Sequence, residues 1–293
     1  MNVRALAASS LLGGVMFAAS TSEMLAQAAG QPLPLSGVAP APAKALQLDL
    51  GGGVLLDLVL VPAGTFQMGN VIPGEKPIHE VTITRPFFLG KFEVTQAQYQ
   101  TVMGSNPSHF KGTNLPVESV SWDKAQEFCA KVSARTGRSV QLPTEAQWEY
   151  ACRAGSKGTY SSGEDLADLK KIAWFSWSGE AQADAPTKPV GSFQPNAFGL
   201  YDMHGNVYEW CADWFDPDFY TRSPKEDPVN LIEVIPPGRK EAQPVLRGGS
   251  AGSPPGKVRA AYRNNYSRMG KHTIGFRVVV LTEAAAPGSR VSP

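Results

Sequence analysis

Four residues at short spacing in the stretch 195–214 are of the types that bind a hard metal ion. Asp202, Gly205, Val207 and Glu209 follow one another at intervals of three, two and two residues. Two carboxylates and the intervening carbonyls of a glycine-containing turn supply the oxygen ligands that calcium prefers. The two acids are also suited to accept hydrogen bonds from turn amides and arginines. The spacing leaves both a calcium site and a structural role open.

The same stretch is dense in aromatic residues and glycine. Tyr208, Trp210 and Trp214 each offer a large apolar face with a polar edge that needs a partner. Gly199 and Gly205 permit backbone conformations that other residues avoid. Because this mixture follows neither a helical nor a strand pattern, we expect a packed, irregular loop held by the rest of the domain.

Glu145 and Glu149 form a second pair of acids, near the start of a predicted helix. Thr144 is a suitable N-cap, and Trp148 and Cys152 fall on one face of the helix that follows it. Acids in this position partner backbone amides and arginines. We therefore expect a structural role rather than a catalytic carboxylate pair.

The cysteine pattern argues against a zinc or iron–sulfur site. Cys129, Cys152 and Cys211 form no CxxC motif, and no histidine lies at short spacing from any of them. An odd number of cysteines leaves at least one thiol without an intramolecular partner. We expect these side chains to act as small buried hydrophobes.

The N-terminus has the features of a secretory signal peptide. Arg4 precedes an apolar run from Ala5 to Ala19, and Ala26-Gln27-Ala28 has the form of a cleavage site. The following residues are mostly Ala, Pro and Gly, a composition typical of a linker. The predicted organisation is a signal peptide over 1–28, a flexible linker over 29–45, a folded domain over 46–283 and a disordered tail over 284–293. This organisation predicts a periplasmic protein with no membrane span after cleavage of the signal.

Composition excludes further classes of partner. The net charge is +1 and no basic run appears, so the sequence predicts no nucleic-acid partner. The 24 prolines and 29 glycines predict a domain rich in turns and loops. Predicted strands cover 53–61, 79–88, 245–250 and 275–281, and predicted helices begin after Thr95, near Asp123 and after Thr144. We interpret residues 160–189 as ordered loop and 220–244 as a surface insertion.

Seven segments, in order, resemble the formylglycine-generating enzyme family, also called the sulfatase-modifying-factor family. They are FQMG (66–69), KFEVTQAQY (91–99), SWDKAQEFC (121–129), LPTEAQWEYACRAG (142–155), NAFGLYDMHGNVYEW (196–210), LRGGS (246–250) and GFRV (275–278). The resemblance spans about Leu46 to Leu281. It implies a single, loop-rich α+β domain related to C-type lectin folds, but a fold alone does not fix a reaction.

The resemblance also implies a structural calcium ion. The family's calcium site maps onto Asp202, the carbonyls of Gly205 and Val207, and Glu209. A second calcium site found in some members has no acidic counterpart around Ala173 and Trp174, and none is expected there.

The family's catalytic thiols are replaced in this chain. The two positions that carry copper-binding cysteines in the oxidases are Ser253 and Val258 here, so no thiolate-bound copper is expected. The positions that would pair with Cys129 and Cys152 are Val278 and Ala260, so we expect all three cysteines to be unpaired. The scaffold is retained without formylglycine-generating chemistry, and the sequence assigns no redox cofactor.

The first functional hypothesis is a different oxidation in the same cleft. Among secreted, cysteine-poor members, the overall likeness is to those that mature the pyoverdine siderophore chromophore by oxidising a tyrosine-derived dihydroxyphenyl ring. The partner would be a small-molecule or peptide siderophore precursor. Candidate catalytic groups are Ser250, Ser253, Arg263, His272 and Glu241, with Tyr262 nearby. His272 would take a phenolic proton and Arg263 would hold a carboxylate or phenolate.

These groups could instead have structural roles, in ion pairs or at the protein surface. Arg247, Arg263 and Arg277 are suited to pair with acids of the stretch 195–214, and His272 fits a surface position. The second hypothesis is a non-catalytic binding or accessory module for a secreted peptide or glycan, and the third is a structural subunit of a periplasmic assembly. The oligomeric state is not fixed by the sequence.

Overall fold

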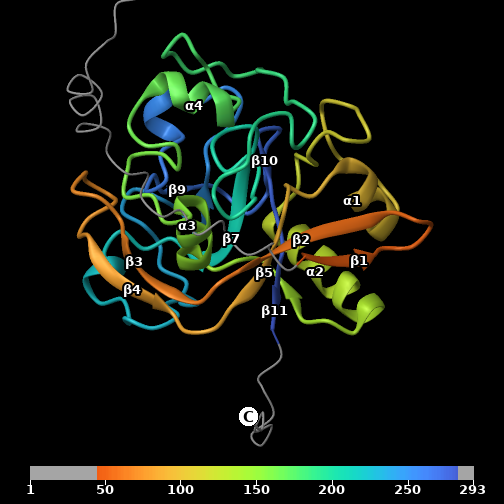
Figure 1. Ribbon diagram of the computed structural model, residues 1–293, viewed down its shortest axis with the longest axis horizontal. Helices are drawn as coiled ribbons and strands as arrows, with labels where there is room; N and C mark the ends of the chain where they lie inside the picture. Colours follow the sequence, from red (N-terminus) through yellow and green to blue (C-terminus); the bar gives the residue numbers. More distant parts are fainter. Residues whose placement is uncertain (1–44, 283–293) are drawn as a thin grey trace, which may run out of the picture. The chain divides into compact units, whose positions relative to one another are not determined.

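Short strands and a few helices alternate with long connecting segments (Figure 1). The computed structural model describes residues 45–282, so the predicted signal peptide, the tail and all of the linker but Ala45 lie outside the described residues. The strands are β1 (Ala45–Asp49), β2 (Leu55–Val61), β3 (Gly64–Met68), β4 (His79–Ile83), β5 (Phe87–Gly90), β6 (Val140–Gln141), β7 (Tyr208–Trp214), β8 (Pro244–Arg247), β9 (Asn264–Asn265), β10 (Ile274–Gly275) and β11 (Val279–Leu281). The helices are α1 (Gln96–Met103), α2 (Trp122–Thr136), α3 (Glu145–Arg153) and α4 (Leu166–Ile172), with 3-10 turns η1 (Phe219–Thr221) and η2 (Pro255–Lys257).

The strands form two sheets and a separate hairpin. The five-stranded sheet has the order β1-β2-β5-β11-β6, so the last strand of the domain lies between strands from its first half. The four-stranded sheet has the order β10-β7-β8-β9, and β7 lies inside it with a parallel neighbour and an antiparallel one. Strands β3 and β4 form a separate two-stranded hairpin, and Thr82 of β4 makes an isolated bridge to Glu226. This mixed arrangement confirms the predicted α+β class.

The predicted helix ends are confirmed by their caps. Thr95 and Thr144 each accept a hydrogen bond from the third residue of their helix, and a glutamine side chain there bonds back, which completes a capping box. Helices α1 and α2 end at Gly104 and Gly137, both in the left-handed conformation that glycine adopts without strain. Local sequence therefore fixes where these helices begin and end.

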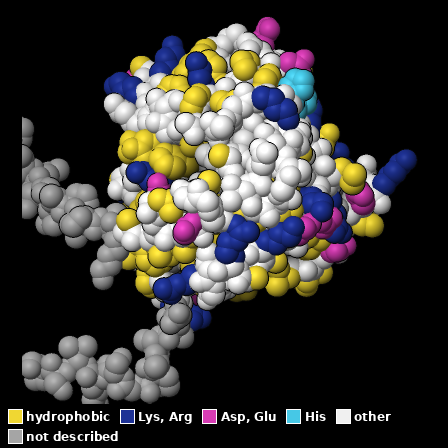
Figure 2. All heavy atoms as spheres, turned by 90° about the vertical axis from the view of Figure 1, so that its right-hand side faces the viewer, with side chains coloured by type: hydrophobic (Ala, Val, Ile, Leu, Met, Phe, Trp, Pro, Cys, Tyr) yellow, Lys and Arg dark blue, Asp and Glu magenta, His cyan; other side chains and the backbone are white. Residues whose placement is uncertain are grey.

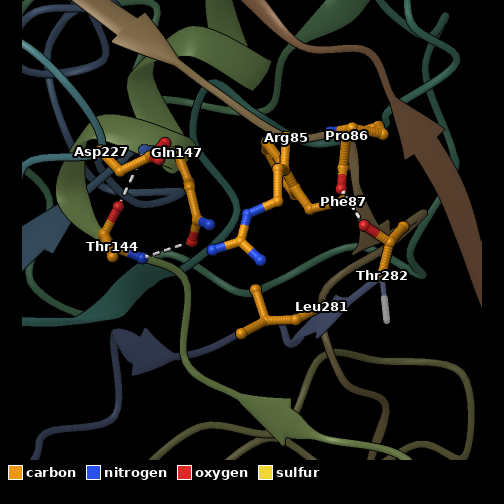
Figure 3. A pocket seen from close by; sticks show the side chains of 8 residues that line it. All are labelled: Arg85, Pro86, Phe87, Thr144, Gln147, Asp227, Leu281 and Thr282. Atoms are coloured by element: carbon orange, nitrogen blue, oxygen red, sulfur yellow. Dashed lines mark hydrogen bonds between the residues drawn. The ribbon is translucent and has the colours of Figure 1, made fainter. Parts of the chain in front are cut away.

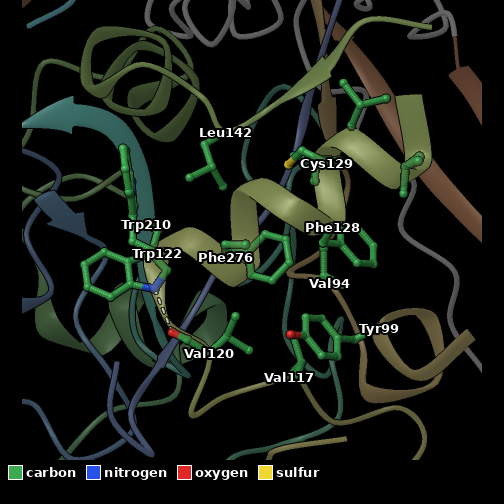
Figure 4. Packing of buried hydrophobic residues seen from close by; sticks show 14 of the residues in the cluster. Val94, Tyr99, Val117, Val120, Trp122, Phe128, Cys129, Leu142, Trp210 and Phe276 are labelled. Atoms are coloured by element: carbon green, nitrogen blue, oxygen red, sulfur yellow. Dashed lines mark hydrogen bonds between the residues drawn. The ribbon is translucent and has the colours of Figure 1, made fainter. Parts of the chain in front are cut away.

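The largest apolar cluster joins α1 and α2 to both sheets (Figure 4). The rings of Tyr99 and Phe128 stack at 5.7 Å between centroids, and Phe276 meets Phe128 edge-on at 5.3 Å. The indole N–H of Trp210 donates to the Val120 carbonyl at 2.9 Å, so this buried tryptophan keeps its polar edge satisfied. Trp210 of the stretch 195–214 is thus held by a segment from the preceding half of the chain.

Several predicted elements need correction. The stretch 195–214 is not loop throughout, because residues 208–214 form β7; its side chains are almost all buried, so no alternation of apolar and polar residues marks it. The predicted strand 79–88 breaks before Pro86, and its two parts join different sheets. Residues 160–189 contain the helix α4, which at seven residues is too short to show a clear period.

Charged side chains are mixed on the surface. Figure 2 shows basic and acidic groups interspersed on one face rather than gathered into a field of one sign. None of the helices within residues 45–282 has the length and apolar character needed to cross a bilayer.

Candidate functional site

Three hydroxyl groups meet at the end of β8. The Ser250 and Ser253 hydroxyl oxygens are 3.1 Å apart, and the Ser250 amide donates to the Ser253 hydroxyl at 3.0 Å. The Ser253 hydroxyl lies 3.3 Å from the Tyr208 hydroxyl, which comes from the first residue of β7. All three residues are buried. We call Ser250, Ser253 and Tyr208 the hydroxyl cluster.

The glycines of the LRGGS motif shape the turn that carries Ser250. Gly249 has a φ of +75°, and a Cβ atom added to it would lie 2.6 Å from the Val258 side chain and 2.7 Å from the Lys257 carbonyl. Both the backbone conformation and the close approach therefore require glycine. Ser253 stands where the family's first catalytic cysteine is expected, so the turn still delivers a polar side chain to that position.

The phenols beside the serines stay protonated near neutral pH. Burial raises the pKa of Tyr208, although hydrogen bonds from Ser253, Asn264 and Tyr262 oppose the effect. Burial and the neighbouring Tyr208 likewise raise the pKa of Tyr262. These groups can donate hydrogen bonds to an oxyanion but are poor proton acceptors at pH 7.

A connecting segment lies directly against this turn. The Ser176 amide donates to the Ser253 carbonyl at 2.9 Å, and the Gln182 amide donates to the Gly252 carbonyl at 2.8 Å. A Cβ atom on Gly252 would lie 1.8 Å from the Gln182 carbonyl oxygen. We call residues 176–184 the cover segment.

His272 contacts the cover segment rather than the hydroxyls. Its Nε2 lies 2.8 Å from the Ala183 carbonyl and 3.3 Å from the Asp184 carboxylate. Its ring also lies 5.8 Å from that of His109. The histidine is therefore a contact between the cover segment and the loop before β10.

The other predicted catalytic residues lie elsewhere. Arg263 is buried in a two-bond ion pair with Glu145, at 2.7 and 2.8 Å, and stacks on Tyr220. Glu241 is exposed on the segment before β8. Among the described residues no hydrogen bond or ion pair joins Arg263, His272 or Glu241 to Ser250 or Ser253, so the structure unites only the two serines of the predicted group.

The second thiol position is buried and apolar. Val258 is fully buried beside Tyr160 and Phe175, and its carbonyl oxygen lies 2.7 Å from Nδ1 of His204. Burial lowers the pKa of His204 to about 4, so the imidazole is neutral near pH 7. Its Nε2 accepts from Ser161, whose hydroxyl lies 2.9 Å away. This histidine holds the Val258 segment in place.

The arginine pairing corrects one expectation and confirms another. Of the three arginines, Arg277 alone has an ion pair with an acid of the stretch 195–214 within residues 45–282, through two bonds of 2.7 Å to Glu209. Arg247 pairs instead with Glu149, and Arg263 with Glu145. The two acids of α3 therefore have the structural role predicted for them.

The predicted calcium ligands surround a group of buried acids. Asp202 accepts from the Gly191 amide at 2.7 Å, and burial raises its pKa to about 6. Glu93, which the sequence reading missed, accepts from Asn206 and from the Val207 amide; burial, followed by the charges of Asp202 and Glu209, raises its pKa well above the usual value. Three carboxylates therefore face a single arginine, Arg277.

The donor chemistry fits a hard cation in part. The carbonyl oxygens of Gly205 and Val207 accept no backbone hydrogen bond among the described residues, and the excess of buried acid would be neutralised by a divalent ion. Both Glu209 oxygens, however, already accept from Arg277, and one also accepts from Trp148 at 2.8 Å. Within residues 45–282 no group of three or more His, Cys, Asp or Glu side chains has a metal-site arrangement, so a cation here would depend on the two carbonyls.

The cysteines are buried and unpaired as predicted. Burial raises the pKa of Cys152 to about 12 and those of Cys129 and Cys211 in the same direction. Thiolates are therefore negligible at neutral pH, and none of the three is an activated nucleophile.

Two residues of these sites were not predicted from the sequence to have a functional role. Tyr208 was assigned only to packing, and Glu93 was not singled out at all. The available signal for Glu93 was an acid between Phe92 and Val94, because a carboxylate within an apolar run must find buried partners.

Relatives of the chain include enzymes and a protein named as a chaperone. The chain is 33% identical over 243 residues to "Chaperone protein LppX" of Paenibacillus barcinonensis, covering 64% of this chain and 84% of the relative. It is 30% identical over 288 residues to the formylglycine-generating enzyme of Streptomyces coelicolor, covering 76% and 85%.

Solved structures share the fold. PvdO from Pseudomonas aeruginosa superposes with a TM-score of 0.68 at 31% identity, covering 78% of this chain and 95% of PvdO. Treponema denticola variable protein 1 gives a TM-score of 0.68 at 26% identity, covering 81% and 99%. Residues 54–282 match the family model "Sulfatase-modifying factor enzyme 1-like domain". The chain therefore belongs to the sulfatase-modifying factor enzyme 1-like family.

Proposed function

We propose that this protein is an exported maturation enzyme that oxidises a tyrosine-derived catechol ring of a siderophore precursor, as in formation of the pyoverdine chromophore. The observation that carries the proposal is the hydroxyl cluster, in which Ser253, at the position that the family resemblance assigns to the first catalytic thiol, contacts the Ser250 and Tyr208 hydroxyls. The similarity to PvdO from a pseudomonad supports it. Membership of a family that contains oxidative enzymes supports a maturation role more broadly.

The role that we assign to the hydroxyl cluster is hydrogen-bond donation to the catechol as it is oxidised. Conversion of a catechol to an ortho-quinone removes two electrons and two protons, and we propose dioxygen as the acceptor, reduced to hydrogen peroxide. The Tyr208 hydroxyl, kept protonated by burial, would donate to the catechol oxygen that gains negative charge. Ser250 and Ser253 would orient Tyr208, since Ser253 lies within hydrogen-bond distance of it.

The direct test uses purified protein and a catechol-bearing siderophore precursor in air. We expect loss of two hydrogens from the precursor by mass spectrometry, and no conversion without oxygen. Tyr208→Phe should lower kcat by roughly 10²-fold, the effect of removing one donor to a developing oxyanion. Protein that converts no precursor, or a Tyr208→Phe variant with unchanged kcat, would contradict the proposal.

His272 provides a matched comparison within the same experiment. His272→Gln should change kcat less than Tyr208→Phe, because the imidazole contacts the cover segment and not the hydroxyls. Sulfatase-derived peptides, with or without copper, should not be converted by any variant, because neither Ser253 nor Val258 supplies a thiolate.

A second candidate function is a non-catalytic accessory module. It is favoured by the similarity to a protein named as a chaperone and by the cover segment, which bonds to Gly252 and Ser253. Binding of the precursor without any oxidation, in air and over many hours, would favour this function over the enzymatic one.

We also propose that Asp202, the Gly205 and Val207 carbonyls and Glu209 hold a structural calcium ion. The support is the unbalanced acid around these groups, described above. The ion would neutralise Asp202 and Glu93 and so stabilise the fold, without a part in the oxidation.

A further inference from the structure

A large cavity lies away from the hydroxyl cluster. It has a volume of about 730 Å³ and is lined by the hairpin β3–β4, the end of α3 and the segment after it. Ser250, Ser253 and Tyr208 are not among its lining residues. Its volume falls in the range of about 300–1,000 Å³ that is typical of small-molecule sites. By contrast, the pocket in Figure 3 is about 220 Å³, and the dashed bonds there join Thr144 to Gln147 and Thr282 to Pro86.

Three aromatic rings form one wall of this cavity, which we call the aromatic cleft. The ring of Tyr150 lies 5.3 Å from that of Phe66 and 5.8 Å from that of Phe198, all tilted. The three residues come from β3, α3 and the loop 195–207, and all line the cavity. Tilted rings at this spacing offer both faces and edges to a further ring. The wall therefore suits an aromatic group.

The floor of the cleft is held rigid by Arg153. Its guanidinium pairs with Glu149 at 2.8 Å and donates to the carbonyls of Gly69 and Gly158, each at 3.2 Å. These bonds tie the turn after β3 to the segment after α3, and both of these segments line the cleft. Arg153 is satisfied by these partners, and a preformed site loses little conformational entropy when it binds.

The polar and charged side chains that line the cleft differ in whether they have hydrogen-bond or ion-pair partners. Glu80 is paired with Lys225 at 2.7 Å, and Glu164 accepts from the Thr159 amide at 2.8 Å. Lys157 is exposed to solvent and lines the cavity, and it makes no hydrogen bond or ion pair with any residue of the described range. The side-chain amide of Asn70 has its oxygen engaged by the Val71 amide, which leaves its N–H groups available. The exposed Lys157 ammonium and the Asn70 side-chain amide are therefore N–H donors that line the cleft without a partner among the described residues, and both can bind an acceptor such as a carboxylate.

We propose that the aromatic cleft binds a small aromatic carboxylate, with the ring against Phe66, Tyr150 and Phe198 and the carboxylate on Lys157. The site is separate from the hydroxyl cluster and does not depend on the proposed oxidation. Lys157 supplies the charge-assisted hydrogen bond and Asn70 a second donor. The aromatic wall supplies most of the apolar contact area.

The test is calorimetric titration of the full chain with two probes that share a ring. 4-Hydroxyphenylacetate carries a carboxylate, and tyramine carries an ammonium on a side chain of the same length. We expect saturable binding of 4-hydroxyphenylacetate and at least about tenfold weaker binding of tyramine, the ratio given by one charge-assisted contact. Equal affinity for the two probes, tighter binding of tyramine, or no saturation by the acid would overturn the proposal.

Variants locate the binding in the cleft. Lys157→Ala should weaken binding of the acid about tenfold, and Lys157→Arg, which keeps the charge, should retain most of it. Lys131→Ala removes the same charge from the exposed face of α2 and should leave binding unchanged. Phe198→Leu should weaken both probes together, since it removes ring contact and no charge. If Lys131→Ala weakens binding as much as Lys157→Ala does, the effect is one of overall charge and the site is not the cleft.

Discussion

Two clusters of buried charge brace this domain, and they differ in balance. In the balanced cluster, three arginines form ion pairs with the two acids of α3. A third acid, Asp213 of β7, accepts a hydrogen bond from the Glu145 amide. In the acid-rich cluster, one arginine near the end of the chain faces three acids. The balanced cluster contains Arg153, Arg247, Arg263, Glu145, Glu149 and Asp213; the acid-rich cluster contains Glu93, Asp202, Glu209 and Arg277.

The electrostatics of the two clusters reflect this difference. Burial opposes ionisation of Glu145, but Arg263 and Arg247 outweigh it and lower the pKa of this acid. In the acid-rich cluster burial prevails, and the pKa values of Glu93 and Asp202 rise. In the first cluster each acid of α3 has an arginine partner, although Asp213 beside them has a raised pKa; in the second, Glu93 and Asp202 have no ion-pair partner of their own within residues 45–282, and protons or a cation would neutralise them. The two clusters are therefore distinguished by charge balance, since the residues of both are buried.

The largest expected effect comes from removing one partner in the balanced cluster. Arg247 and Glu149 are both fully buried and form an ion pair. The substitution Arg247→Met therefore leaves the buried Glu149 carboxylate with Arg153 as its remaining ion-pair partner among the described residues. Loss of one partner of a buried pair costs about 3–5 kcal/mol of the free energy of unfolding. Urea unfolding followed by tryptophan fluorescence measures the change.

The double variant Arg247→Met with Glu149→Gln is the control for this prediction. It leaves no unpaired charge, so we expect it to be more stable than Arg247→Met alone, with a coupling free energy of roughly 1–3 kcal/mol. Additive losses from the two substitutions would show that the pair is not coupled.

Calcium should have the next largest effect, and only through the acid-rich cluster. At about 100 times its dissociation constant, a cation bound only by the folded chain adds about 2.7 kcal/mol. Chelation should therefore lower the melting temperature at pH 7.5, and Glu209→Ala or Asp202→Ala should remove that sensitivity.

The calcium experiment has an internal contrast. The Arg247→Met variant should keep the response to calcium, because Arg247 belongs to the balanced cluster. A melting curve that does not change with excess chelator, in protein shown to have contained no other bound metal, would return Asp202 and Glu209 to a purely structural role.

The parts of the fold that local chemistry determines were predicted correctly. Thr95 and Thr144 mark helix starts through their caps, and Gly137 marks a helix end through its left-handed backbone. Strand β7 and the division of residues 79–88 between two sheets were not predicted, because they depend on pairing with distant segments. A fully buried strand also lacks the alternation by which a strand is found.

The candidate site was predicted only in part: the two serines were grouped correctly, and the other members were not. Ser250 and Ser253 were placed together through the resemblance to the family, and they do share a hydrogen bond. Arg263 and His272 were grouped with them because they are close in sequence, yet Arg263 turns to Glu145 and His272 to Ala183. Side-chain direction is set by tertiary packing, which sequence proximity does not encode. Tyr208 reaches the serines from another strand and could be found only in three dimensions.

A smaller effect is expected from the dependence of stability on pH at Asp213. Burial, followed by the charge of Glu145, raises the pKa of Asp213 to about 7, above its usual value near 4. The folded state therefore binds the proton more tightly, so this contribution to stability is complete below pH 4 and is lost as pH rises through 7. Asp213→Asn should cost most at pH 4–5, about 1–3 kcal/mol, because the amide cannot accept from both the Glu145 and Asn230 backbone N–H groups. The difference from the parent protein should shrink by pH 8, and a difference that instead grows with pH would mean that Asp213 is ionised in the fold throughout this range.

The smallest effect is expected at an exposed acid, and it sharpens the contrast with the buried clusters. Glu127 on α2 pairs with Lys124 at 2.6 Å and with Lys131 at 3.0 Å, so by count of ion pairs it matches Glu149. Hydrogen bonds from the two lysines lower its pKa, but its side chain, unlike that of Glu149, is partly exposed to solvent. Water and salt screen such pairs, and ordering the long lysine side chains opposes them. Glu127→Ala should therefore leave the urea midpoint within experimental error of the parent protein, at low and at high salt. If this substitution destabilised the protein as much as Glu149→Gln does, the number of ion pairs and not their burial would govern stability here, and the distinction between a balanced buried cluster and ordinary surface pairs would fail.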